Sequence, residues 1–368
     1  MPTAPPAPPD LDGCSTAHKL LMLSQWDSDL HAHLFSIADL AVTSRSGALP
    51  TTQLDVVTQW RSPAQIVDMQ VSELTGQEVL LALAMHNGSL LLSRFLVPRA
   101  PGSTPAQVDI LVLPQGEEGE GLQPQLEGLH KGSISSVDVQ ASSKAVLTVG
   151  GDGAINIVDA ELGLQGEQQG VTTFKRRKHG CSAFTCGRWT GTSTFLTASA
   201  LGGLEAWDTR MGPVSTSHSP AKWGPVGTGD VGGARDQLQV SFSGPPQVHA
   251  LAVHPSRPDL VACGATGGVV GVWDLRWTAK PLITSLPGGA MDDVWDVRFD
   301  PMQQQQTADG APGVLFSTQG GCLGLSVGRT SAALASSHHA VTSFDVDAQG
   351  CDLVAVTGGN EVIYVRRG

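Results

Sequence analysis

Three short segments of the sequence have residue types and spacings that could do chemistry. Residues 227–232 (GTGDVG) have the Gly-x-Gly-x-x-Gly spacing of a loop that cradles the pyrophosphate of a dinucleotide. Residues 31–33 (HAH) and 338–339 (HH) bring imidazoles close together in the chain, as in some metal sites. Each pattern needs a particular structural setting, so the neighbouring sequence decides between a site and a loop.

The settings do not match the chemistry. A dinucleotide loop needs a strand before its glycines and a helix that opens on the phosphates, whereas a Trp-Gly-Pro loop comes before residues 227–232. The histidine pairs lack companion ligands at metal spacing. The sequence has no His-Glu-x-x-His, no Gly-x-Ser-x-Gly and no Cys/His pair with an obvious orienting partner. We therefore expect a protein that is not an enzyme and that binds no cofactor and no metal.

Charge bears on the choice of partner. The formal net charge is −12, and such a surface repels phosphate backbones and anionic membranes, so we expect no direct nucleic-acid partner. Against this background, residues 175–178 (Lys175 to Lys178, KRRK) form a compact basic run. We favour a solvated loop between strands for this run, and a nuclear import signal or a contact for acidic partners is the alternative.

Residues 79–97 are long and leucine-rich enough to be considered as a membrane span. They are interrupted by residues 86–89 (HNGS), and Asn-Gly between two apolar runs is a strong hairpin signal. The sequence therefore predicts two strands here and no transmembrane segment. At the N-terminus no basic region precedes an apolar run, so no secretory signal is expected. The six cysteines are scattered without a Cys-x-x-Cys pair, which is typical of small buried hydrophobic residues in a reducing compartment.

Short apolar runs separated by Gly, Pro and Asn turns fill most of the chain, which predicts an antiparallel all-β protein. The clearest unit is 247–277, where three such runs end in Trp273-Asp274. Similar units recur along the chain, at residues 18–37, 65–97, 130–160, 179–210, 247–277, 292–329 and 340–367. The connecting segments are polar, and we expect a disordered Pro-rich segment at 1–16 and long loop insertions at about 98–128 and 211–246.

One such unit cannot bury both of its faces, whereas radial packing of several units covers them. The seven units therefore predict a seven-bladed WD40-type β-propeller, a single closed ring that takes up residues 17–368.

Several polar and aromatic residues are candidates for holding the blades together. His130, Thr148 and Asp152 match the hydrogen-bonded set of a WD repeat, although residues 156–158 (NIV) stand where its Trp is expected. The remaining structural candidates are Trp207, Asp208, Trp273, Asp274 and Trp295. We also expect an acidic residue at one fixed place of the first strands, at Asp68, Asp138, Asp296 and Asp345. No residue is singled out for partner binding.

Six stretches together resemble the WD-repeat nucleoporin family of about 43 kDa, from the Y-shaped outer-ring complex of the nuclear pore. They are residues 25–39 (QWDSDLHAHLFSIAD), 146–157 (VLTVGGDGAINI), 195–210 (FLTASALGGLEAWDTR), 267–276 (GGVVGVWDLR), 292–301 (DDVWDVRFDP) and 361–367 (EVIYVRR). The sequence departs from the family at residues 1–10, which replace a basic, aromatic strand, at 323–326 (LGLS), where the family has Trp, and in the two insertions. The first departure leaves open whether residues 1–16 or a partner complete the seventh blade.

The resemblance implies a non-catalytic structural scaffold subunit of the nuclear pore complex, a protein–protein interaction platform in pore assembly and nucleocytoplasmic transport. The implied partners are other outer-ring nucleoporins, especially the helical short-arm scaffold nucleoporin of about 85 kDa. The implied location is the nuclear pore at the nuclear envelope, with the kinetochore in mitosis as a further site.

A WD-repeat substrate receptor of a cullin-type ubiquitin ligase is the alternative. Residues 207–210 (WDTR) and 273–276 (WDLR) both fit the Trp-Asp-x-Arg ending with which such receptors meet their adaptor. The acidic residue usually found earlier in that box is missing from both turns, and the ending is common in propellers without this role.

Overall fold

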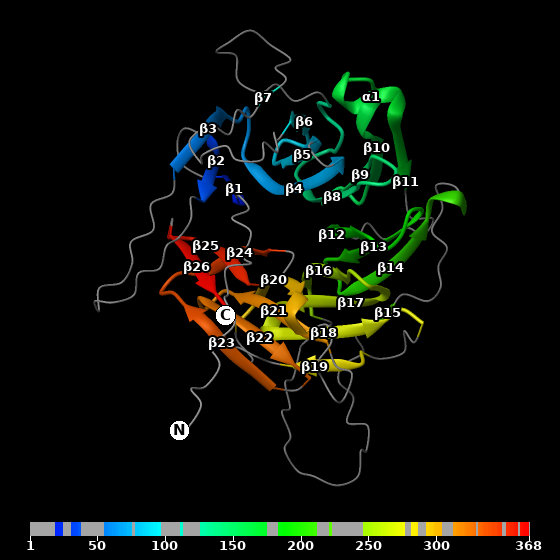
Figure 1. Ribbon diagram of the computed structural model, residues 1–368. Helices are drawn as coiled ribbons and strands as arrows, with labels where there is room; N and C mark the ends of the chain where they lie inside the picture. The colour runs from blue at the N-terminus through cyan, green and yellow to red at the C-terminus, as the bar shows by residue number, and fades with distance from the viewer. Residues whose placement is uncertain are drawn as a thin grey trace, which may run out of the picture.

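The computed structural model shows an all-β protein whose strands form seven small antiparallel sheets (Figure 1). It describes residues 19–24, 31–37, 55–75, 78–96, 111–112, 126–174, 183–211, 221–222, 246–276, 281–285, 292–303, 312–328, 330–347, 351–359 and 361–367. In every sheet, strands that follow one another in the chain are hydrogen-bonded neighbours, which is the order of a meander. We number the sheets 1 to 7 along the chain.

Three of the sheets come from the N-terminal half of the chain. Sheet 1 contains β1 (Lys19–Ser24), β2 (His31–Ile37) and β3 (Asp55–Arg61). Sheet 2 contains β4 (Ile66–Thr75), β5 (Glu78–Met85), β6 (Leu90–Leu96) and β7 (Leu111–Val112). Sheet 3 contains β8 (Ile134–Gln140), β9 (Ala145–Gly150), β10 (Ile155–Asp159) and β11 (Val171–Phe174).

The other four sheets follow in order. Sheet 4 contains β12 (Phe184–Trp189), β13 (Thr194–Ser199), β14 (Gly203–Asp208) and β15 (Ala221–Lys222). Sheet 5 contains β16 (Val248–His254), β17 (Arg257–Ala265), β18 (Val269–Asp274) and β19 (Ile283–Ser285). Sheet 6 contains β20 (Val294–Phe299), β21 (Gly313–Thr318), β22 (Cys322–Val327) and β23 (Thr330–Ser336), and sheet 7 contains β24 (Val341–Val346), β25 (Asp352–Thr357) and β26 (Val362–Arg366).

The described helices are single turns. The α-helix α1 (Ala160–Leu164) begins after Asp159, whose carboxylate accepts the N–H groups of Glu161 and Leu162 as an N-cap. The 3-10 turns are η1 (Gln168–Gly170), η2 (Thr209–Met211), η3 (Thr266–Gly268) and η4 (Pro301–Gln303). None of these described helices is long and apolar enough to cross a membrane.

The sheets pack face to face in chain order. The first strands of sheets 2 to 7, which we call the inner strands, contact one another in the order β4, β8, β12, β16, β20, β24. Clusters of buried apolar side chains fill the space between neighbouring sheets, between sheets 2 and 3, 3 and 4, 4 and 5, 5 and 6, and 6 and 7. Burial of these side chains is the main force that holds the sheets together.

A shared β-bulge aligns the inner strands. In each one the pairing register shifts just after the first residue, for example between Val294 and Asp296 in β20. Counted from that first residue, Asp68 and Asp296 are two residues along their strands, whereas Asp138 and Asp345 are four along. The expectation that all four acidic residues share one fixed place is therefore wrong, because the repeats are offset by two residues.

One side of the molecule carries the turns between second and third strands, and we call it the turn face. In five sheets this turn is tied to the start of the inner strand by a backbone hydrogen bond. The donor is an N–H in or next to the turn, and the acceptor is a carbonyl oxygen just before the inner strand. The pairs are His86 with Gln65, Ala200 with Ala183, Thr266 with Gln247, Gln319 with Asp293 and Gly358 with Ala340, at 2.8 to 2.9 Å. The turn face therefore also carries the beginnings of the inner strands.

Most expected strands are present. Residues 79–97 contain the strands β5 and β6, joined by the turn at 86–89, so the hairpin interpretation is confirmed. The sequence missed β3 and the outer strands β11, β15, β19 and β23. Of these, β11, β15 and β19 have only two to four residues, and β23 has no buried residue. Residues 1–16, 175–178 and 227–232, and most of the two insertions, lie outside the described residues.

Candidate functional site

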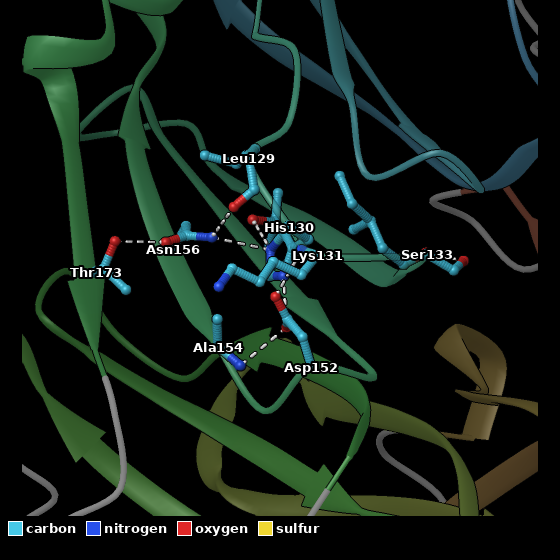
Figure 2. A network of polar contacts seen from close by, with 10 residues as sticks. Leu129, His130, Lys131, Ser133, Asp152, Ala154, Asn156 and Thr173 are labelled. Atoms are coloured by element: carbon cyan, nitrogen blue, oxygen red, sulfur yellow. Dashed lines mark hydrogen bonds and ion pairs between the residues drawn. The ribbon is translucent and has the colours of Figure 1, made fainter. Parts of the chain in front are cut away.

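A buried polar network joins the turn before β8 to the turn between β9 and β10 (Figure 2). The His130 ring lies between two partners, with Nδ1 3.0 Å from Asp152 Oδ1 and Nε2 3.0 Å from Thr148 Oγ1. Asp152 also accepts the backbone N–H groups of Lys131 (2.8 Å) and Ala154 (3.0 Å). The structure thus brings together the three residues that the WD pattern singled out in this sheet.

Asn156 is a fourth member of the network that the sequence did not reveal. It pairs with Thr148 across β9 and β10, and its Nδ2 lies 3.1 Å from the carbonyl oxygen of Leu129 and 3.0 Å from His130 Nε2. Its Oδ1 accepts the hydroxyl of Thr173 at 2.7 Å. The carbonyl of Leu129 can only accept, so the NH₂ group of Asn156 must face it and the ring.

This orientation fixes the proton on the histidine. Because Asn156 Nδ2 donates to His130 Nε2, that nitrogen must be an acceptor, and the ring proton lies on Nδ1 where Asp152 accepts it. Partial burial would raise the pKa of Asp152, but the hydrogen bonds from His130, Lys131 and Ala154 outweigh it and lower the pKa. The carboxylate therefore stays ionised and holds both turns.

The hydroxyl, imidazole and carboxylate stand in the order of a nucleophilic triad, and burial decides what they can do. Thr148 is 0% exposed, and His130 is also buried. The nitrogen that would take the hydroxyl proton already accepts from Asn156. A substrate cannot reach the hydroxyl, so the network serves to pin two turns rather than to attack a bond.

The two Trp-Asp dipeptides bury their indoles in the cores of sheets 4 and 5. Trp207 donates from Nε1 to Thr197 Oγ1 at 2.9 Å and stacks on Phe195, with ring centroids 5.9 Å apart. Trp273 is fully buried in sheet 5, where Cys263 takes the place of Thr197 and its thiol donates to the carbonyl oxygen of Gly271 at 3.4 Å. In sheet 3 Val158 holds the place of these indoles, opposite Val146, and Asn156 makes the bond to His130 from two residues earlier.

Each Trp-Asp-x-Arg ending closes on itself. Arg210 donates from Nη2 to Asp208 at 2.6 Å, and Arg276 donates in the same way to Asp274 at 2.6 Å. These side-chain bonds lower the pKa of both carboxyls to about 2. The guanidinium groups are exposed at their outer side, but their forks are already occupied by their own aspartates, which leaves them poorly placed for a second bidentate partner.

Carboxylates also bridge neighbouring inner strands. Asp68 Oδ2 accepts the N–H of Val137 (2.9 Å) in the next sheet, and Asp138 Oδ2 accepts that of Trp189 (2.7 Å). In both pairs the donor is one place further along its strand than the acceptor. Burial raises the pKa of Asp138, and the nearby Arg188 opposes that shift. Each aspartate thus ties its sheet to the next one.

Arg188 gathers the polar groups between sheets 2, 3 and 4. Its Nη1 donates to Ser136 Oγ (2.8 Å) and to the carbonyl of Val137 (3.1 Å). Burial by itself would lower the pKa of this guanidinium, but the carboxylates of Asp68 and Asp138 outweigh it and raise the pKa. No local pattern marks this residue, since its partners include residues of two other repeats.

A comparison with known proteins gives a reference for these features. No family model matches the chain. The curated Nuclear pore complex protein NUP43 of Arabidopsis thaliana is 23% identical over 355 residues, which cover 92% of this chain and 88% of that protein. The chain is Nup43-like. The human Nucleoporin Nup43 is 24% identical over 169 residues, which cover 46% of this chain and 37% of the human protein.

Trp295, the last structural candidate in this Nup43-like chain, lies on the turn face and takes no part in the network around His130. Its Nε1 donates to Gln319 Oε1 at 2.6 Å, and its ring lies against His249 of the neighbouring inner strand, with centroids 4.6 Å apart. Burial lowers the pKa of His249, and Asp293 opposes this shift. Leu201, on the turn of sheet 4, is 67% exposed on the same face. The turn face therefore carries an exposed aliphatic side chain, Leu201, and a half-buried indole, Trp295.

Nothing in these matches supports the ligase-receptor alternative for the Nup43-like chain, since both relatives are nucleoporins by name. Of the eight residues expected to hold the blades, His130, Thr148 and Asp152 meet in one network. Trp207, Asp208, Trp273 and Asp274 act within their own sheets, and Trp295 meets a residue of the neighbouring sheet.

Proposed function

We propose that this Nup43-like chain is a non-catalytic scaffold subunit of the nuclear pore complex, at the nuclear envelope. The observation that carries the proposal is the match to Arabidopsis NUP43 along 92% of the chain. That protein is named as part of the nuclear pore complex. The partners in this proposal are other outer-ring nucleoporins, among them the helical scaffold nucleoporin of the short arm.

The fold supports this role. We infer a WD-repeat propeller of seven blades over residues 17–368 that closes between sheets 7 and 1. Support comes from the seven sheets and from the inner strands, which contact one another in chain order. The network around His130, the two buried indoles and the bridging aspartates supply the stiffness that such a ring needs. A rigid ring with several exposed edges suits a protein whose task is to hold others in place.

Within this proposal the turn face is the partner-binding side. An exposed Leu and a half-buried Trp on one face leave apolar surface in contact with water, and Trp is enriched at the centres of interfaces. Trp295 and the 67%-exposed Leu201 both lie on the turn face. On the opposite side, Met302 in η4 is exposed as well, and it provides a matched control.

Affinity purification of the tagged full-length chain from its own cells tests the proposal. We expect outer-ring nucleoporins in the purified material and a fluorescent rim at the nucleus. A folded chain that recovers no nucleoporin would contradict the role itself. Leu201→Glu and Trp295→Ala should reduce recovery at least about fivefold, while Met302→Glu should leave it unchanged. The reverse pattern would place the partner on the opposite side and leave the scaffold role intact.

A further inference from the structure

Sheet 1 has an open strand position at its inner end. Its last strand, β3, leads into β4 through residues 62–65, and the outer strand β23 of sheet 6 leads into β24 through an equally short link, 337–340. By this connectivity β3 is the outer strand of its sheet. In the order β1-β2-β3 the inner end is then β1, which lies toward the middle of the molecule in Figure 1. Among the described residues, no strand pairs with the other edge of β1.

The inner strand of sheet 2 is poorly covered on the side that faces this position. In an inner strand, the first, fourth and sixth residues face the preceding sheet, as Ile134 and Val137 do where they pack on sheet 2. The first residues of the five later inner strands are 0 to 2% exposed. In β4 the corresponding Ile66 and Met69 are only half-buried, and Val71 is 46% exposed. These apolar side chains are therefore partly exposed to solvent on the side that faces the open position.

The inner strand of sheet 7 is open on the opposite flank. Asp296 of β20 accepts its own neighbour's N–H, from Val297, on Oδ1 (2.8 Å), and the N–H of Phe344 in the next inner strand on Oδ2 (3.3 Å). Asp345 of β24 likewise accepts the N–H of Val346 on Oδ1 (2.9 Å). It finds no second donor among the described residues, and its side chain is exposed. The other bridging aspartates accept an N–H of the neighbouring inner strand on Oδ2. The second oxygen of Asp345 can accept in the same way if a strand lies beside β24.

We propose that an extended segment of a partner polypeptide binds in this position as an added strand, antiparallel to β1. One of its faces covers Ile66, Met69 and Val71, and one of its N–H groups donates to Asp345. Asp138, at the same place of its strand as Asp345, receives the N–H of the sixth residue of β12, so the donor is the sixth residue of the added strand. That residue cannot be proline, because proline has no N–H.

The composition of residues 1–18 favours a partner over this segment as the occupant. All six inner strands begin with Ile, Val or Phe, which become buried against the preceding sheet or face it. Residues 1–18 contain no Ile, Val or Phe and five prolines, and proline cannot supply the N–H groups of a ladder. The occupant is therefore a segment with aliphatic or aromatic residues at its first, fourth and sixth places. This proposal does not depend on a role at the nuclear pore.

A free peptide with the sequence of residues 247–254 (QVHALAVH) is a suitable probe, since it copies the inner strand β16 and has Val, Leu and Val at the three places. We would measure hydrogen exchange of the full-length chain with and without the peptide. We expect about tenfold slower exchange in residues 19–24 at saturation. A peptide with proline at its sixth strand residue, the counterpart of Val253, should give no slowing.

Two protein variants sharpen the test. Asp345→Ala should weaken binding of the peptide about tenfold, the usual effect of losing one charge-assisted hydrogen bond, while the melting temperature stays unchanged because the side chain is exposed. Asp259→Ala, which removes an exposed carboxylate from sheet 5, is the matched control and should bind as the unaltered chain does. Absence of slowing at millimolar peptide, or slowing at β3 or β26 instead, would overturn the proposal. It would also be overturned if residues 19–24 were already protected and lost that protection when residues 1–16 were removed.

Discussion

Arg367 forms a bidentate ion pair with Asp300, with Nη1–Oδ2 and Nη2–Oδ1 distances of 2.9 and 2.8 Å. Asp300 follows β20 in sheet 6 and Arg367 follows β26 in sheet 7, and their side chains are 0% and 12% exposed. Removal of one partner of such a pair leaves a buried charge without its counter-charge, which costs far more than the pair itself contributes. The pair therefore fastens the last described strand to the neighbouring sheet.

Arg367→Ala should lower the free energy of unfolding by about 3 kcal/mol, because the buried carboxyl group of Asp300 would lose its hydrogen-bonded counter-charge. Urea denaturation followed by tryptophan fluorescence measures this loss. Arg366→Ala is the matched control, since that neighbouring side chain is 51% exposed and lies 3.9 Å from Asp352. It should cost less than about 1 kcal/mol. Equal losses for the two variants would show that the buried pair has no special weight.

Gly150 and Gly151 are adjacent, and alanine should be tolerated at only one of them. A Cβ on Gly150 would lie 2.5 Å from His130 Nδ1 and 3.0 Å from the carbonyl oxygen of Ser133, whereas a Cβ on Gly151 would meet nothing within 4 Å. We expect Gly150→Ala to cost about 2 kcal/mol through displacement of the imidazole, and Gly151→Ala to stay within about 0.5 kcal/mol. Thermal unfolding of the two variants, side by side, decides this.

The pH dependence of stability should report on Asp152. Its pKa is lowered by the fold below the ordinary value of 3.8, so its ionised form stabilises the protein above that pH, and the contribution is lost as the pH falls through the folded-state pKa. At about pH 7, Asp152→Asn should cost about 1–2 kcal/mol. The difference between variant and unaltered chain should shrink below about pH 4. A difference that stayed constant down to acid unfolding would contradict the assignment.

Buried Asp138 and Asp296 change the stability with pH in the opposite direction to Asp152. The effect of Asp152 must therefore be taken from the difference between the variant and the unaltered chain, and not from the pH dependence of the unaltered chain alone. Burial raises the pKa of both carboxyls. Their ionisation in the fold therefore subtracts stability as the pH rises above 3.8.

The tautomer of His130 can be observed directly. With Asn156 donating to Nε2, the imidazole should carry its proton on Nδ1, and nitrogen NMR of histidine-labelled protein should show one protonated and one bare ring nitrogen in that arrangement. Asn156→Ala removes the donor and the bond to Thr173, and should cost about 1–2 kcal/mol. A proton found on Nε2 would mean that the amide of Asn156 is turned the other way.

The sequence predicted those features that depend on local pattern. Alternating apolar residues and Gly-rich turns predicted the units, and the spacing of His130, Thr148 and Asp152 predicted that these three residues form a network. Asn156 was not predicted as a member of the network, because its role depends on its position opposite Thr148 in the β9–β10 ladder. That position is known only once the pairing register of the two strands is known. The pair Asp300–Arg367, 67 residues apart, has no local signal at all.

The two-residue offset between the bridging aspartates was not predicted either, for a related reason. Asp68 and Asp138 occur in look-alike strands, but with the shared bulge as reference they lie two and four residues beyond the strand start. Residue letters alone do not locate a bulge, since it is a property of the pairing between two strands. The outer strands β11 and β23 are mainly exposed or half-buried, so no apolar alternation marked them.

The bonds that tie each turn to the residue at or near the start of an inner strand join backbone atoms only. Any residue other than proline can donate them, so these bonds by themselves do not require a particular side chain at the donor. The backbone outline at these five positions can therefore stay the same when the donor residue changes. Bonds of this kind are compatible with the 23% identity at which 92% of the chain aligns with its Arabidopsis relative.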